Sequence, residues 1–138
     1  MWIRFDGAGA NGYSLSGWQE GGSYNYFGRL NTGNLYYYMG DSTGGDSGYA
    51  LSLSTWYMLT QTVDASGNHN VYVDTTSRVS NSSINLGDAG SVPLTVGAIG
   101  GTSNYWHNGL ISTVAFYNTN FTQSDVESFY NATKTNFV

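Results

Sequence analysis

Short strand-like runs separated by turns are the feature that most limits how this chain can fold. Segments rich in Tyr, Val, Ile, Thr and Trp recur along the sequence, and clusters of Gly, Asn, Asp and Ser divide them. Many short strands with such connections are typical of an all-β sandwich or barrel, and not of alternating strands and helices. The predicted strands are Trp2–Asp6, Tyr13–Trp18, Tyr24–Leu30, Asn34–Met39, Tyr49–Ser54, Thr55–Val63, Asn70–Thr75, Leu94–Ile99 and Leu110–Asn118.

Two of these strands have a readable alternation of side chains. Val71 and Val73 fall on one face of their strand, with Tyr72 and Asp74 on the other. In 110–117, apolar side chains occur on both faces. We therefore predict that this last strand is a central one.

One helix is predicted, near the C-terminal end. Thr122 is a suitable N-cap, and Asp125 would lie near the positive end of the helix dipole. A stripe at helical spacing follows, formed by Val126, Phe129, Tyr130 and Thr133. We expect this stripe to pack against the sandwich, because so short a helix needs docking to persist.

Length and composition indicate one domain, 1–138, and exclude several classes of protein. Only 9% of the residues are charged, against roughly 25% in an average soluble domain. The four Lys and Arg residues form no basic patch, so nucleic acid is not an expected partner. No apolar run approaches the ~18 residues of a membrane span, and there is no cysteine for a disulfide or a thiol nucleophile.

The acidic residues and histidines do not form a recognisable catalytic pattern. Glycoside hydrolysis needs two carboxylates that face one another across the substrate. The chain has two Glu residues, Glu20 in a predicted turn and Glu127 on the predicted helix. His69 in a turn and His107 in a loop have no partner pattern for nucleophilic catalysis. We predict that the chain is not an enzyme.

Aromatic clusters are the candidate binding features. Tyr36 and Tyr38 share a face of one predicted strand, with Tyr24 and Tyr26 on the strand before it. A loop carries a second cluster, formed by Tyr105, Trp106, His107 and Asn108. Aromatic rings with amide and hydroxyl neighbours suit glycans, while the alternative is that the rings form cross-strand pairs that stabilise a sheet.

Calcium is the one cofactor for which the sequence offers candidate ligands. Asp41 and Asp46 share a predicted glycine-rich loop, 40–48, in which backbone carbonyls could converge with the carboxylates on a hard cation. The alternative is that both Asp residues form Asx-turns.

Several segments in order resemble a known family. They are WYMLTQTVD (56–64), VYVD (71–74), LTVGAIG (94–100), GLISTVAFYN (109–118) and the helix FTQSDVESFYNATK (121–134). This progression is similar to the laminin-G-like, concanavalin A-like sandwich family, and it implies a two-sheet antiparallel jelly roll with one short C-terminal helix. Thr75 departs from the glycine usual in the family.

The resemblance also raises a question about the strand at Trp2. The family has a further strand before this position. We therefore expect that the chain is part of a longer polypeptide, or that the edge beside Trp2 is covered by a neighbour or left open.

The function predicted from these features is a non-enzymatic recognition or structural module. In its low Lys content and its abundance of Ser, Thr, Asn and Tyr, the chain resembles members of the family from phage and other virus particles. We predict a capsid decoration protein or a tail fibre or spike component on the virion surface, with other virion proteins or identical subunits as partners and host glycans as ligands. The alternative is a carbohydrate-binding or adhesion module of a bacterial secreted or cell-surface protein.

Overall fold

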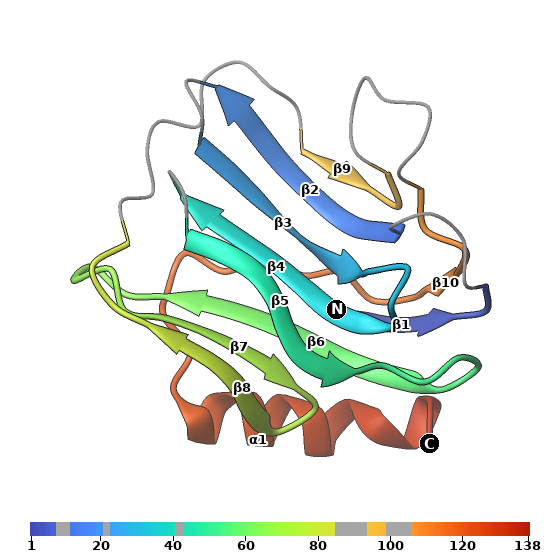
Figure 1. Ribbon diagram of the computed structural model, residues 1–138. Helices are drawn as coiled ribbons and strands as arrows, with labels where there is room; N and C mark the ends of the chain where they lie inside the picture. Colours follow the sequence, from blue (N-terminus) through green and yellow to red (C-terminus); the bar gives the residue numbers. More distant parts are fainter. Residues whose placement is uncertain (8–11, 21–22, 41–42, 85–93, 99–105) are drawn as a thin grey trace.

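Two antiparallel sheets form the part of the chain described by the computed structural model, which covers 1–7, 12–20, 23–40, 43–84, 94–98 and 106–138 (Figure 1). The first sheet has the order β10 (Gly109–Ile111), β1 (Trp2–Phe5), β6 (Trp56–Val63), β7 (His69–Val73) and β8 (Thr76–Asn81). The second has the order β5 (Thr43–Ala50), β4 (Asn34–Gly40), β3 (Ser23–Arg29), β2 (Gly12–Glu20) and β9 (Thr95–Val96). The predicted two-sheet, all-β architecture is confirmed.

The core lies between the two sheets and is filled by the side chains that alternate inward along the strands. In β1, Ile3 and Phe5 point inward, while Trp2 and Arg4 point to the outer face. The predicted shared face of Val71 and Val73 is confirmed, because both side chains are buried in this core. The buried core residues are Ile3, Phe5, Phe27, Leu35, Leu51, Tyr57, Leu59, Val71 and Val73.

The predicted C-terminal helix is α1 (Gln123–Thr133), followed by a 3₁₀ turn over Lys134–Asn136. Thr122 and Asp125 form a reciprocal capping box at its start, as the sequence predicts in part. The helix lies beneath the sheet that contains β6–β8 (Figure 1). None of the described helices is long and apolar enough to cross a membrane.

The strand at Trp2 is not at an edge of its sheet, so the expectation of an edge beside Trp2 is wrong, while the alternative of a longer polypeptide stays a prediction. β1 pairs with β10 on one side and with β6 on the other, so that Ile3 faces both Ile111 and Tyr57. The strand predicted to be central is instead the edge, because β10 is the outermost strand and ends at Ile111. Its continuation has apolar residues on both faces for another reason: Val114 packs into the core, and Tyr117 packs against the helix side.

Two strands, β8 and β5, lie where the sequence does not predict a strand. β8 has the sequence TSRVSN and is mostly exposed, so it lacks the apolar alternation that marks a strand. β5 occupies most of the glycine-rich segment 40–48, for which the sequence predicts a loop. The strand predicted over Tyr49–Ser54 ends at Ala50, and Leu51 turns into the core.

Candidate functional site

Three tyrosines gather on the outer face of the second sheet, and we call them the tyrosine platform. Leu35 and Met39 of β4 are buried in the interior, so alternation places Tyr36 and Tyr38 on the opposite face. On β3, Tyr26 lies directly across from Tyr38 in the strand register. The platform therefore consists of Tyr26, Tyr36 and Tyr38.

The rings of the platform lie side by side. The ring centroids of Tyr26 and Tyr36 are 5.8 Å apart with 17° between the planes, and those of Tyr26 and Tyr38 are 5.3 Å apart. Tyr36 and Tyr38 are separated by 6.4 Å. These distances fall within the range of favourable aromatic pairs. All three side chains are partly exposed, so each ring presents part of its surface to the outside.

Glycine at a neighbouring position allows this arrangement. Gly44 of β5 is paired with Tyr38, and a Cβ atom at this position would overlap the Tyr38 ring. The ring therefore leans over β5 in the space that a side chain would otherwise fill. Gly28 occupies the corresponding position opposite Tyr36 on β3. Glycine residues therefore lie across from Tyr36 on β3 and from Tyr38 on β5.

Polar groups border the platform on the β5 side. Asp46 is paired with Tyr36 in the register and is exposed. Its Oδ2 accepts a hydrogen bond of 3.0 Å from Asn34 Nδ2, and its Oδ1 accepts one of 2.7 Å from the Gly48 backbone N–H. A carboxylate and an amide are thus held in place next to the rings.

Of the two proposed calcium ligands, Asp46 lies in a strand and not in the expected loop. Asp46 lies within β5, and its bond from Gly48 N–H is the Asx-turn interaction of the alternative interpretation. Asp41 lies outside the described residues. Among the residues that the structure does describe, no three His, Asp or Glu side chains are grouped to hold a metal ion. The calcium site stays a prediction.

Beneath β4, one histidine is enclosed in the sandwich. His69 is the first residue of β7 and not part of a turn as expected, and its side chain has no exposed surface. Its Nε2 lies 3.0 Å from Gln61 Nε2, and its ring lies 5.9 Å from that of Tyr37. Burial lowers the pKa of His69 to about 4, so it is neutral at physiological pH.

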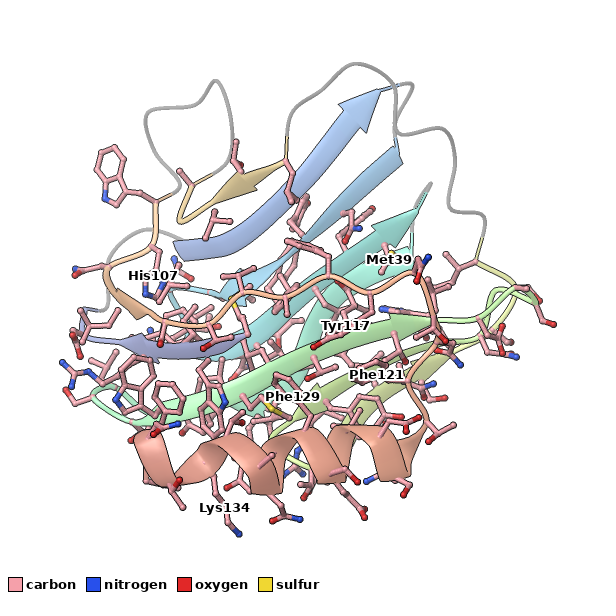
Figure 2. All side chains as sticks on the ribbon, turned by 180° about the vertical axis from the view of Figure 1, so that it is seen from behind. Met39, His107, Tyr117, Phe121, Phe129 and Lys134 are labelled. Carbon is pink, nitrogen blue, oxygen red and sulfur yellow. The ribbon has the colours of Figure 1, made fainter. Side chains whose placement is uncertain are left out.

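The second predicted cluster is only partly a surface feature. Tyr105 lies outside the described residues, while Trp106 is 60% exposed and forms a bridge with Ala98. His107 turns inward (Figure 2): its Nε2 is 3.1 Å from the Arg4 carbonyl oxygen, and its ring meets the Phe5 ring edge-on at 4.9 Å.

The other residues of this cluster are tied to the scaffold. Burial lowers the pKa of His107, although hydrogen bonds to the Arg4 and Leu110 backbone act against this effect. Asn108 has an exposed side chain, and its carbonyl oxygen accepts the Asp6 N–H. His107 is therefore an anchoring residue, and Trp106 and Asn108 are the exposed members.

The two predicted clusters do not form one site. Tyr36 and Tyr38 lie on β4, whereas Trp106 is bridged to Ala98, just beyond β9. β3, β2 and β9 lie between them in the sheet order. The sequence places Tyr26 on the strand before Tyr36 and Tyr38 but does not include it among the site residues; its pairing with Tyr38 follows from the register, which the sequence alone does not determine.

Two antiparallel sheets with the core between them define a β-sandwich. Residues 1–127 match the family described as the concanavalin A-like lectin/glucanases superfamily, and the chain belongs to this family. The predicted concanavalin A-like sandwich is confirmed. Among curated proteins, none matches the chain.

Proposed function

We propose that this chain is a non-enzymatic carbohydrate-binding module and that the tyrosine platform is its sugar-binding surface. The observation that carries the proposal is the arrangement of Tyr26, Tyr36 and Tyr38 side by side on an outer face. The C–H groups of a sugar ring pack on aromatic faces, and three adjacent rings offer room for more than one sugar unit. The family to which the chain belongs is compatible with this function.

The border of the platform supplies polar partners for sugar hydroxyls. The exposed carboxylate of Asp46 can accept hydrogen bonds from hydroxyls, and Asn34 lies beside it. A site that combines apolar rings with a few fixed polar groups is the usual design of a small-molecule site. Neither group would repel a neutral sugar, whereas the negative charge of Asp46 disfavours acidic ones.

The proposal that the module binds sugars without hydrolysing them rests on where its carboxylates lie. Inverting and retaining glycosidases both need a facing pair of carboxyl groups. Glu127 lies exposed on α1, where it accepts a hydrogen bond of 2.8 Å from Gln123, and α1 covers the other sheet. The carboxylate of Asp46 is hydrogen-bonded to the Asn34 side chain and the Gly48 N–H, and not paired with a second carboxyl group.

The biological setting is a narrower proposal. We place the module on the surface of a virus particle, in contact with identical subunits or other virion proteins, with the platform directed at host glycans. The support is compositional: 9% charged residues and 12 tyrosines in 138 residues. The alternative setting is a secreted or cell-surface protein of a bacterium, and both settings use the same sugar site.

A glycan array with the purified protein tests the proposed function. We expect binding to neutral glycans that Tyr38→Ala abolishes and that Trp106→Ala leaves intact. Tyr38 and Trp106 belong to the two separate clusters, so each variant is the control for the other. Silence on the array would contradict the lectin proposal, and loss of binding in Trp106→Ala alone would move the site away from the platform.

A further inference from the structure

The buried histidine of β7 contacts the strand that carries two of the three platform rings. Tyr37 stands between Tyr36 and Tyr38 in β4, and its side chain packs against the core on the inner face. The ring of His69 lies 5.9 Å from the ring of Tyr37. His69 therefore packs beneath β4, on the face opposite to the one that presents Tyr36 and Tyr38.

Gln61 of β6 connects His69 to the same strand a second time. Its Nε2 lies 3.0 Å from Nε2 of His69 and donates a hydrogen bond of 3.4 Å to the carbonyl oxygen of Tyr38. An amide nitrogen only donates, so Nε2 of His69 is the acceptor and the ring proton is on Nδ1. This contact exists only while His69 is neutral, because a protonated imidazole carries N–H on both nitrogens.

The surroundings of His69 provide no partner for a positive charge. The groups that face it among the described residues are Tyr37 from β4, Gln61 from β6 and Asn81 from β8; none of the three is charged, and only Tyr37 can titrate. Within the described structure, Nδ1 of His69 and Nδ2 of Asn81 are both buried without a hydrogen bond. Burial is also what lowers the pKa of His69 to about 4.

A protonated His69 is therefore not stable in this position. Its new N–H would meet an N–H of Gln61 at 3.0 Å, and an unpaired charge in an uncharged interior is costly. His69 is the first residue of β7, and the turn before it contains the exposed residues Ser66 and Asn68. The ring can reach water by a movement at the end of the strand, where local opening needs less free energy than unfolding of the core.

We propose that His69 is an acid-sensitive switch for the tyrosine platform: when it is protonated it leaves the interior, Gln61 loses its place against Tyr38, and the platform releases sugar. This inference rests on the proposed function, because it names the regulation of the same site. Two contacts transmit the change to β4, the Tyr37 ring and the Tyr38 carbonyl oxygen. A buried histidine that biases a local two-state element is an established design for a pH switch.

The direction of the response follows from the two environments of the ring. Displaced into water, His69 binds a proton below about pH 6.5. Enclosed in the sandwich, it resists protonation down to about pH 4. Each pH unit between these limits shifts the balance tenfold toward the displaced form, so the shift over the whole window is up to roughly 300-fold. Above pH 6.5 the balance does not change.

The pH is the probe, and the purified protein is followed by NMR from pH 7.5 to pH 4 with its aromatic rings assigned. We expect the ring signals of Tyr36 and Tyr38 to follow the titration curve of His69, while those of Trp2 under α1 stay constant. Affinity for a neutral glycan selected on the array should be at least about tenfold weaker at pH 4.5 than at pH 7. Movement of the Trp2 signals together with those of the tyrosines would indicate global unfolding and overturn the local switch.

The two histidines provide a matched pair of variants. His69→Gln keeps an oxygen that accepts from Gln61 but does not bind a proton in this range, so we expect it to bind glycan equally at both pH values. His69→Leu is a second variant that does not titrate, for use if the first does not fold. His107→Gln removes the histidine that contacts Phe5, and it should keep the full acid response. A response that persists without His69, or that is lost in His107→Gln, would overturn the proposal.

The switch and the sugar site can fail separately. Equal affinity for glycan at pH 7 and pH 4.5 would overturn the switch and leave the sugar site intact. Absence of glycan binding at every pH would overturn the sugar site, and the ring signals would then decide the switch alone. A joint titration of the platform rings with His69 supports it, and constant ring signals overturn it.

Discussion

The two outer faces of this sandwich carry aromatic side chains for different purposes. On the first sheet, Trp2, Met58 and Tyr72 are buried under α1 with Val126. On the second, Tyr26 and its neighbours in the platform are partly exposed, and Figure 1 shows α1 on the side of the other sheet. The comparison teaches that aromatic residues in the strands do not by themselves indicate a binding site. What distinguishes the platform is that no described helix covers it.

The covered face should lose the most when its aromatic centre is removed. Trp2 stacks on Phe137 at 4.5 Å and donates a 2.8 Å hydrogen bond from Nε1 to Thr133 Oγ1. We expect Trp2→Ala to lower the free energy of unfolding by about 3–5 kcal/mol, measured by urea denaturation. Tyr38→Ala, on the open face, should cost about 1 kcal/mol or less. Equal costs at the two positions would break the comparison.

The interior between the two faces should respond to acid. His69 has its pKa lowered to about 4 by burial, whereas an unfolded histidine binds a proton below about 6.5. Below pH 6.5 the unfolded chain therefore gains a proton that the folded chain does not accept. Stability should fall by up to roughly 3 kcal/mol as the pH drops from 6.5 to 4.

A variant isolates the contribution of this histidine. We expect His69→Leu to show a smaller loss of stability over the same pH range, measured by urea denaturation at a series of pH values. The other titrating groups are common to both proteins, so the difference between the two pH profiles belongs to His69. Identical profiles would mean that this side chain is not buried in its neutral form.

The helix that covers the first sheet should depend measurably on its cap. Asp125 N–H donates to Thr122 Oγ1, and the Asp125 carboxylate accepts from the Thr122 backbone N–H at 2.8 Å. Thr122→Ala should lower stability by about 1 kcal/mol and speed amide exchange at Val126. Thr135, exposed beyond the end of α1, provides the control. If Thr135→Ala has the same effect as Thr122→Ala, the capping box does not hold the helix.

The smallest effect is expected at the border of the open face. Asp46 has its carboxylate occupied by Asn34 and the Gly48 N–H, so we expect a chelator to shift the melting temperature by less than about 1 °C. A larger shift that disappears in Asp46→Ala would establish the calcium site. It would also sharpen the comparison, because the open face would then contain an ion beside its rings.

Part of this fold follows from local sequence patterns, and part depends on pairing over long distances. Two predictions rest on patterns within a single element: the shared face of Val71 and Val73, and the apolar stripe on α1. The structure confirms both. β8 has no such pattern and is a strand only because it pairs with β7. The order of strands in the sheet also has no local signal, so the apolar residues on both faces of 110–117 wrongly predict a central strand where β10 is the edge.

The candidate site also has residues that local patterns identify and residues that depend on the pairing of distant strands. Tyr36 and Tyr38 share a face by simple alternation, and the sequence selected both. The partnership with Tyr26 requires the β3–β4 register, and the open position at Gly44 requires the β4–β5 register. The inward turn of His107 depends on Arg4, which lies 103 residues earlier in the chain.

The central claim is that the open face binds sugar through its tyrosines. Its most direct test is an NMR titration of the protein with a glycan selected on the array, with the aromatic side chains assigned. The claim predicts that the ring signals of Tyr26, Tyr36 and Tyr38 shift together along one saturating curve, while those of Trp2 under α1 do not move. Shifts confined to Trp106, with the three tyrosines unchanged, would contradict it.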